Sequence, residues 1–243
     1  MKKCPYCGAE IEENKAVCPE CGKKQPVAAY QNSYEKSENS FFEKFIYSVK
    51  DLVFNPKEFF DSLTEKTNVL SAFYYFFTVI LISSLFNSLW SISMMGNMRR
   101  IMSQYGEELG NQAFMQGFYS GVGSMSIITV FLRTIIFGVI GIFVVAAIAH
   151  LILIIFGEGK YGFENTIKAF FFGYTPNLLV IIPFCGSMIG SIWAIVLTII
   201  GVAHLQKTSY GKAAASVLSI IILCCFIGLL FAGSMAAIFK NFG

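Results

Sequence analysis

Residues 134–156 read TIIFGVIGIFVVAAIAHLILIIF and contain no Asp, Glu, Lys or Arg. The hydrocarbon core of a bilayer is about 30 Å thick, and a helix rising about 1.5 Å per residue crosses it with about twenty residues. This run has the required length and composition. It therefore predicts a membrane-spanning helix and sets the fold class of the chain.

Four further apolar runs lie on either side of it, at residues 69–95, 166–183, 187–206 and 213–239. The 243-residue chain is 55% hydrophobic and 14% charged, which is typical of a protein whose body is solvated by lipid. We predict five spans in a membrane domain at 67–240. The third run is short, and Pro176 in its interior predicts a kink. If this run re-entered the membrane instead of crossing it, the C-terminus would change sides.

Lysines and arginines near the ends of the spans predict the orientation. With the N-terminus in the cytoplasm, every lysine except Lys240 lies on the cytoplasmic side, and Lys207 and Lys212 flank a cytoplasmic turn. The outer side then receives Arg99, Arg100, Arg133 and Lys240. We expect the N-terminus inside and the C-terminus outside.

Two copies of one motif precede the membrane domain, Cys4-Pro5-Tyr6-Cys7-Gly8 and Cys18-Pro19-Glu20-Cys21-Gly22. Two such loops can close a tetrahedral four-sulfur site around Zn²⁺. The proline pre-sets each turn, and the glycine permits the positive φ that directs N–H groups toward the thiolates. We predict a zinc ribbon at 1–24 with Cys4, Cys7, Cys18 and Cys21 as ligands, folded by the metal.

Disulfides, free thiols and rubredoxin-type iron are the alternatives to zinc. No apolar leader separates Lys2 and Lys3 from Cys4, and a reducing compartment fits this start better than an oxidising one. Five lysines against four glutamates in residues 1–26 give the head a near balance of charge. Nucleic-acid binding needs a concentrated basic face, so this balance favours a protein-binding or structural role.

Residues 25–40 are polar, lack periodicity and predict a flexible linker. At 41–66 we predict amphipathic helices in the membrane interface, because apolar residues recur at helical spacing opposite Glu43, Lys44, Lys50 and Asp51. A second helix is expected to begin at Asn55, as a side-chain cap, with Pro56 in the first turn.

Few residues could support catalysis, since the chain has two histidines and no acidic pair inside the predicted spans. His150 would lie about 9 Å from the cytoplasmic end of its span, and His204 near the same face. With Glu158 and Glu164 they could form a proton-responsive or metal-binding cluster. An interhelical hydrogen bond plus loop charges is the interpretation we favour. The candidate polar site comprises His150, His204, Glu158, Tyr174 and Pro176.

Gly186 and Gly190 form a small-xxx-small face that permits close helix approach. Packing inside the bundle explains the pair as readily as a homo-oligomer does. Oligomerisation therefore stays open.

Several motifs together resemble the Yip family of Ypt/Rab-interacting membrane proteins over about residues 42–240. These are Asn55-Pro56-Lys57-Glu58-Phe59-Phe60, the glycine loop at 157–164, Phe172-Gly173-Tyr174-Thr175-Pro176, and Trp193 followed by Gly201. The order of the motifs and the five-span count carry the resemblance. Prokaryotic members with a zinc ribbon ahead of the membrane domain look like this chain, which implies a prokaryotic cytoplasmic membrane.

The resemblance implies a five-span helical bundle, a cytoplasmic N-terminus and a role in recruiting partners, and it does not imply an enzyme. Binding of small GTPases is not carried over, because the ribbon replaces the N-terminal region of the eukaryotic members. We therefore expect an all-α polytopic scaffold or adaptor that contacts lipids and a protein partner. A transporter or channel is the first alternative, and a membrane-tethered nucleic-acid-binding regulator is the second.

Overall fold

The computed structural model describes residues 2–3, 7–11, 19–22, 40–63, 67–105, 126–220 and 222–223. The chain divides into two compact units, Met1–Thr67 and Asn68–Gly243, and each is described by itself. Most of the predicted linker at 25–40 lies outside the described residues. So does most of the predicted fifth span at 213–239, of which only the first residues are described.

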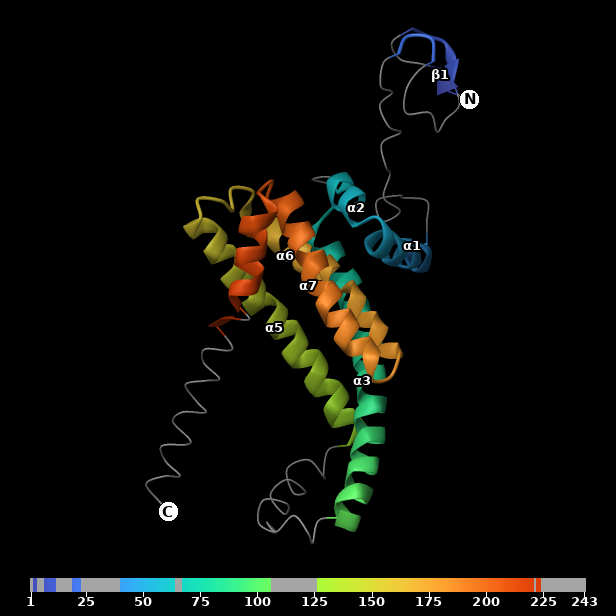
Figure 1. The fold of residues 1–243 in the computed structure, drawn as a ribbon, viewed down its shortest axis with the longest axis vertical. Coiled ribbons are helices and arrows are strands. Elements are labelled where there is room, and N and C mark those ends of the chain that lie inside the picture. Colours follow the sequence, from blue (N-terminus) through green and yellow to red (C-terminus); the bar gives the residue numbers. More distant parts are fainter. Residues whose placement is uncertain are drawn as a thin grey trace. The chain divides into compact units, whose positions relative to one another are not determined.

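A short hairpin opens the N-terminal unit. Strand β1 (Lys2–Lys3) pairs antiparallel with β2 (Glu10–Ile11), with Lys2 opposite Ile11 and Lys3 opposite Glu10 (Figure 1). The chain between these strands carries the first Cys-x-x-Cys motif. The paired strands therefore flank that motif in the sequence.

Helix α1 (Phe41–Phe54) begins with a reciprocal cap. The Glu43 backbone N–H donates to Ser40 Oγ at 3.3 Å, and the Ser40 N–H donates to Glu43 Oε2 at 3.0 Å. This capping box satisfies two N–H groups that the first turn would leave without partners. Ser40-x-x-Glu43 is the sequence signature of this cap and was not among the predicted helix starts.

Helix α2 (Pro56–Ser62) follows directly and has Pro56 in its first turn, as expected. The expected cap by the Asn55 side chain is wrong, because that side chain makes no capping hydrogen bond. Asn55 has φ −135° and ψ 54°. Its backbone N–H donates to the Asp51 carbonyl and closes the last turn of α1. One residue thus serves both helix ends through its backbone.

The surface of α1 has a buried stripe and an exposed apolar stripe. Leu52 is fully buried, whereas Phe42 is 70% and Ile46 48% exposed. On α2, Phe59 and Phe60 are buried and pack edge to face with ring centroids 5.6 Å apart. The amphipathic pattern predicted for 41–66 is therefore present, and the interfacial position stays a prediction.

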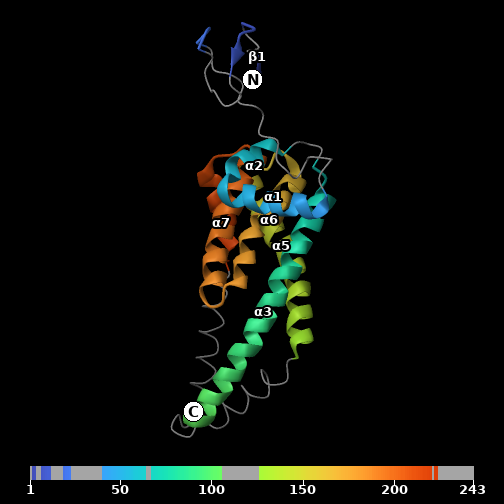
Figure 2. The ribbon, with the colours of Figure 1, turned by 90° about the vertical axis from the view of Figure 1, so that its right-hand side faces the viewer.

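Three described helices of the second unit are long and apolar enough to cross a membrane. They belong to α3 (Val69–Tyr105), α5 (Ile127–Ile155) and α7 (Cys185–Leu205), which Figure 2 shows together with the shorter α6. Only 22% of the most apolar window of α5 is buried, as expected for a helix that faces lipid. The chain is thus an integral membrane protein. Helix α5 begins seven residues before the predicted span at 134–156, so Arg133 lies within the helix.

The third predicted span is not one α-helix. Helix α6 (Gly162–Gly173) ends before Tyr174, and a 3₁₀ helix, η1 (Thr175–Ile181), continues the segment with Pro176 in its first turn. The sequence predicts a kink at Pro176 inside a helix; instead, the α-helix ends at Gly173 and a helix of another type begins beside Pro176. With rises of about 1.5 and 2.0 Å per residue, α6 contributes about 18 Å and η1 about 14 Å, against about 31 Å for α7. Because a 3₁₀ helix rises more per residue than an α-helix, α6 and η1 together are about as long as α7.

A tight turn joins η1 to α7. Phe184 has φ 66° and ψ −64°, and the Cys185 N–H donates to the Pro183 carbonyl at 2.8 Å, which makes a γ-turn of the strained, positive-φ kind. The Phe184 side chain is 78% exposed at this tip. The continuous segment α6–η1 therefore forms a hairpin with α7, and the turn between them exposes an apolar side chain.

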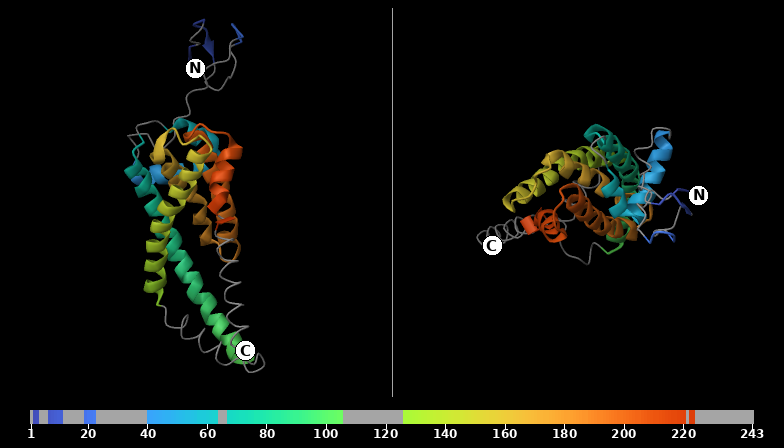
Figure 3. Two further views of the ribbon diagram at one scale, coloured as in Figure 1. Left: turned by 90° about the vertical axis from the view of Figure 1, so that its left-hand side faces the viewer. Right: turned by 90° about the horizontal axis from the view of Figure 1, so that it is seen from above.

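Helix α6 lies at the centre of the membrane unit. It contacts α3, α5 and α7, and every residue from Thr166 to Gly173 is buried. Phe171 stacks on Phe76 of α3 at 5.2 Å and meets Phe143 of α5 edge to face at 5.6 Å. Figure 3 shows the helix of residues 210–220 beside α5 and α7. Aromatic packing around one central helix thus links the spans, as required where lipid supplies no hydrophobic drive.

The small-residue face of α7 is used inside the bundle. A Cβ on Gly190 would lie 2.6 Å from the Pro176 carbonyl oxygen, and a Cβ on Gly186 would overlap with that of Leu179. Both carbonyls belong to η1. The two glycines therefore let the backbone of α7 approach the 3₁₀ helix directly.

Candidate functional site

The two metal-motif turns share one backbone geometry. Gly8 has φ 75° and Gly22 has φ 65°, which confirms the expected positive φ after each second cysteine. A Cβ at either position would meet no atom within 4 Å, so the backbone conformation alone explains the choice of glycine. The glycine that closes each motif therefore has the same kind of backbone conformation in both copies.

Half of the predicted ligand set can be placed. Cys7 is exposed and Cys21 partly exposed, whereas Cys4 and Cys18 lie outside the described residues. Within the part of the chain that the structure describes, no group of three or more His, Cys, Asp or Glu side chains could hold a metal ion. That finding covers His150, His204, Glu158 and Glu164, which do not form the metal-binding cluster considered from the sequence.

A second candidate site lies where the loop from α5 to α6 meets the end of α7. Gly157, Gly159 and Gly162 all have positive φ, which folds the loop sharply between the two helices. The carbonyl and N–H groups of this loop face Gln206, the residue that follows α7. We call His150, Tyr161, Gly162, Thr166 and Gln206 the loop cluster.

Gln206 is the centre of the loop cluster and is 1% exposed. Its Nε2 donates to the Gly162 carbonyl at 2.7 Å and to Thr166 Oγ1 at 2.9 Å, while its Oε1 accepts from the Tyr161 N–H at 3.3 Å. The amide thereby uses both of its donor hydrogens and its oxygen. A fully satisfied buried amide fixes the loop on α7.

His150 joins the loop cluster from α5. Its Nδ1 lies 2.9 Å from Thr166 Oγ1, which also accepts from Gln206. The Thr166 hydroxyl thus bridges the His150 ring of α5 and the Gln206 amide that follows α7. The favoured interpretation of His150, an interhelical hydrogen bond, agrees with this contact.

Charged groups surround the loop cluster without entering it. Lys212 Nζ donates to Glu158 Oε1 at 2.7 Å, and this hydrogen bond lowers the pKa of the Glu158 carboxyl. His204 Nε2 lies 2.6 Å from the Tyr210 hydroxyl, and Lys207 Nζ is 4.9 Å from the centre of the Tyr161 ring. His150, His204 and Glu158 therefore lie at one end of the bundle with separate partners.

Tyr174 and Pro176 occupy the break between α6 and η1, away from the loop cluster. Side chains from α3 satisfy this break: the Tyr75 hydroxyl lies 3.0 Å from Thr175 Oγ1, and Trp90 Nε1 donates to the Val180 carbonyl at 2.9 Å. Asn177 Nδ2 donates to the Tyr174 carbonyl at 2.9 Å. The polar groups freed by the helix break thus find partners inside the protein, as a membrane requires.

These sites favour holding the bundle together over moving a solute. Thr198 donates to the Ala194 carbonyl at 2.7 Å, and Thr175 and Asn177 bond the local backbone. Among the described residues, each of these three donors thus bonds a backbone carbonyl three or four residues before it, and Thr175 also contacts Tyr75 of α3. Their arrangement gives no support to the transport alternative.

Thr166, Gln206 and Lys168 were not identified from the sequence as candidate residues. Lys168 is 7% exposed in α6, and its Nζ donates to Asn165 Oδ1 at 3.4 Å. A polar residue directly after an apolar run, as Gln206 is, was the available signal for the loop cluster. Its partners are 40 and 44 residues away in sequence, and no periodicity reveals that pairing.

The sequence model described as the Yip1 domain matches residues 50–232. The matched range includes α2, all the described helices of the membrane unit, the loop cluster and the α6–η1 break. No curated protein and no solved structure matches the chain. Because the match covers most of the chain and the membrane unit has the expected apolar helices, the chain belongs to the Yip1 domain family.

Proposed function

We propose that the protein is a non-enzymatic membrane scaffold whose zinc ribbon recruits a cytosolic or membrane protein partner. The observation that carries the proposal is the pair of Cys-x-x-Cys-Gly turns with matching positive φ at Gly8 and Gly22. These turns precede a membrane unit whose described polar groups are largely occupied with holding the bundle together. The part of the chain outside the membrane is then the part available for a partner.

Zn²⁺ is the metal that this donor set fits. Cys4, Cys7, Cys18 and Cys21 would hold it, and four thiolates in two tight turns are the ligands of structural zinc sites. The β1–β2 pairing brackets the first turn and supports the same arrangement. When bound, the metal would supply the folding free energy that so short a segment lacks.

A protein partner suits the head better than nucleic acid does. Glu10, Pro19 and Glu20 are exposed beside the turns, and the lysines and glutamates of residues 1–26 nearly balance. Phosphate binding requires a net basic surface that releases counterions. A mixed surface of small area is instead typical of transient protein contacts.

Crosslinking in cells tests the recruitment. The full-length protein is compared with a Cys4, Cys7, Cys18 and Cys21→Ser variant and with Cys185→Ser, which removes a thiol outside the ribbon. We expect one partner to be captured with the wild type and with Cys185→Ser and to be lost with the ribbon variant. That partner should bind the purified full-length protein, and a zinc chelator should abolish the binding.

Equal capture by all three proteins would overturn recruitment by the ribbon. Binding of the purified protein to nucleic acid that falls steeply with salt would favour the nucleic-acid alternative. Counterflow of a solute in proteoliposomes that is unchanged in the ribbon variant would favour the transport alternative. Each result separates the proposed role from one rival.

We infer that the protein has five spans, with a cytoplasmic N-terminus and an external C-terminus, in a prokaryotic cytoplasmic membrane. The matching lengths of α6–η1 and α7 support a third segment that crosses, because the two elements form one hairpin of nearly equal arms. Lys160, Lys207 and Lys212 gather at the open end of that hairpin, and the positive-inside rule assigns this end to the cytoplasm.

Single-cysteine labelling tests this orientation in a cysteine-free background. We expect Ser209→Cys to react only from the cytoplasm and Gly243→Cys only from outside. Ser187→Cys, near the hairpin tip, should react from outside if α6–η1 crosses the membrane. Labelling of both position 187 and position 209 from the cytoplasm would show a re-entrant hairpin and would overturn the five-span topology.

A further inference from the structure

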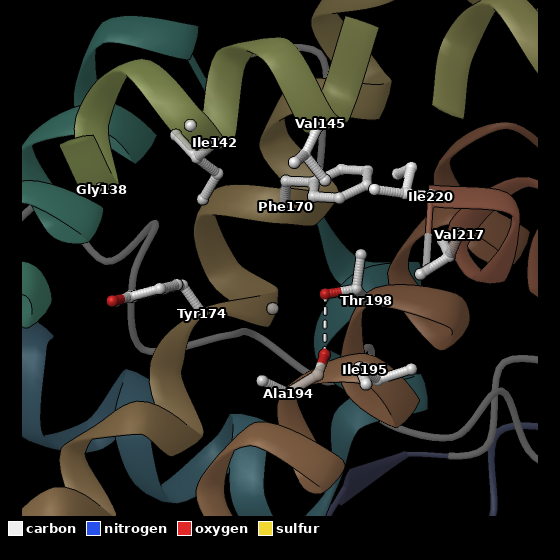
Figure 4. Close-up of a pocket in the computed structure, with 12 residues that line it drawn as sticks. Gly138, Ile142, Val145, Phe170, Tyr174, Ala194, Ile195, Thr198, Val217 and Ile220 are labelled. Carbon is white, nitrogen blue, oxygen red and sulfur yellow. Dashed lines mark hydrogen bonds between the residues drawn. The ribbon is translucent and has the colours of Figure 1, made fainter. Parts of the chain in front are cut away.

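A cavity of about 310 Å³, open to the outside, lies between helices of the membrane unit and is separate from the loop cluster (Figure 4). Its walls come from α5, α6, α7 and the helix of residues 210–220. Gly141, at the middle of α5, and Ile195, at the middle of α7, both line it. The cavity therefore lies at mid-length of both helices, which would place it near the midplane of a bilayer that they cross.

The lining of the cavity is almost entirely apolar. It contains no charged residue, and Tyr174 and Thr198 supply its hydroxyl groups. Thr198 Oγ1 donates to the Ala194 carbonyl at 2.7 Å, and Figure 4 shows the Tyr174 ring turned away from Thr198. A buried polar ligand without partners would be strongly disfavoured here, so the occupant must be apolar.

Gly141 keeps the cavity open. A glycine in a helix interior costs about 1 kcal/mol relative to alanine, and such a residue needs a reason. Two other lining glycines have one in close packing, because a Cβ on Gly138 would strike Ile80 and a Cβ on Gly173 would strike Thr198. A Cβ on Gly141 would meet no atom within 4 Å. The missing side chain at 141 thus leaves space that the helix contacts do not fill.

The size and depth of the cavity identify the class of ligand. An apolar cavity of about 150 Å³ holds a benzene molecule, and this one has about twice that volume. At the bilayer midplane the abundant apolar species is the end of a lipid chain. We propose that the cavity between α5, α6, α7 and residues 210–220 binds the terminal part of one phospholipid acyl chain. This site would make the protein a specific lipid binder whatever the role of its ribbon.

Photo-crosslinking of the full-length protein tests the site. The probe is a phosphatidylcholine with a diazirine at the end of one acyl chain, and peptide mass spectrometry locates the adducts. We expect adducts on Ile142 and Val145, which line the cavity from α5; Figure 4 shows Val145 beside the Phe170 ring. A probe with its diazirine next to the headgroup should not label these residues.

Two variants fill the space from different helices. Gly141→Leu fills it from α5 and Ile195→Phe from α7, and both should lose the adducts on the lining residues. Gly211→Leu is the matched control, since a Cβ on Gly211 also meets no atom within 4 Å and the residue does not line the cavity. Thermal unfolding in detergent shows which variants fold. If Gly141→Leu does not fold, Ile195→Phe still tests the site.

Absence of adducts on the lining residues of the wild-type protein would overturn the proposal. The same result is expected if another part of the chain fills the cavity. Adducts that persist in both folded filling variants would do the same. Labelling confined to exposed side chains of α5, such as Phe137, would show ordinary contact with bulk lipid and no bound chain.

Discussion

A protein with Cys18→Ser and Cys21→Ser is expected to lose one bound zinc ion per chain and to unfold from residue 1 to 24. Removing two of four thiolates leaves an incomplete tetrahedral site, and structural zinc contributes an apparent binding free energy of about 10–16 kcal/mol in small domains. No apolar core of comparable size can replace it in so short a segment. Zinc analysis and limited proteolysis of the purified full-length protein measure both effects.

Membrane insertion should be unaffected in the same variant, because the apolar helices partition by their own hydrophobicity. Cys185→Ser is the control: it removes a thiol from the hairpin tip and should leave the zinc content at one per chain. Retention of zinc by the double serine variant would contradict the assigned ligand set. Loss of the protein from the membrane fraction would contradict the division into two independent units.

Gly186→Val is expected to destabilise the membrane unit by about 3 kcal/mol or more. The new side chain would overlap with the backbone carbonyl of Leu179 in η1, and a backbone group cannot move aside as the end of a side chain can. Gly190→Val should cost less, because its Cβ would lie 2.6 Å from the Pro176 carbonyl oxygen and a smaller shift relieves the contact. Thermal unfolding in detergent gives the order of stability.

Gly211→Val provides the reference for this series, since open space surrounds a Cβ at 211. It should unfold at nearly the wild-type temperature. A Gly186→Val protein as stable as Gly211→Val would show that α7 does not approach η1 closely. If Gly186→Val had wild-type stability but a different oligomeric state, the small-residue face of α7 would instead form a contact between two protein molecules.

Local chemistry made several features predictable from the sequence. Runs of apolar residues indicated most bounds of α3, α5 and α7 to within a few residues. Two bounds were missed: α3 continues ten residues beyond its predicted end, and α5 begins two turns earlier than predicted, where Arg133 interrupts the apolar run. Pro176 indicated a departure from regular helix in the third segment because a missing N–H acts locally. The positive φ at Gly8 and Gly22 was also predictable, because glycine adopts this backbone conformation without a steric cost.

Features that depend on the packing of distant segments were not predictable. Gln206 meets Gly162 and Thr166 only after α6 and α7 have packed together, and the cavity requires four helices in place. The expected Asn55 cap failed because its backbone conformation depends on where the preceding helix ends. The five-span count, the zinc ligands and the orientation stay predictions.

The γ-turn at Phe184 has a consequence for biogenesis. No Asp, Glu, Lys or Arg occurs between Lys168 and Lys207, so the whole length from mid-α6 through the turn to the end of α7 is free of formal charge. Carrying one such charge to the centre of a membrane costs about 2.5–3.5 kcal/mol on insertion scales. A hairpin that enters tip first, from the side of its lysine-bearing open end, avoids that cost entirely. If α6–η1 crosses the membrane beside α7, the tight apolar turn would allow the two segments to enter the bilayer together as one hairpin.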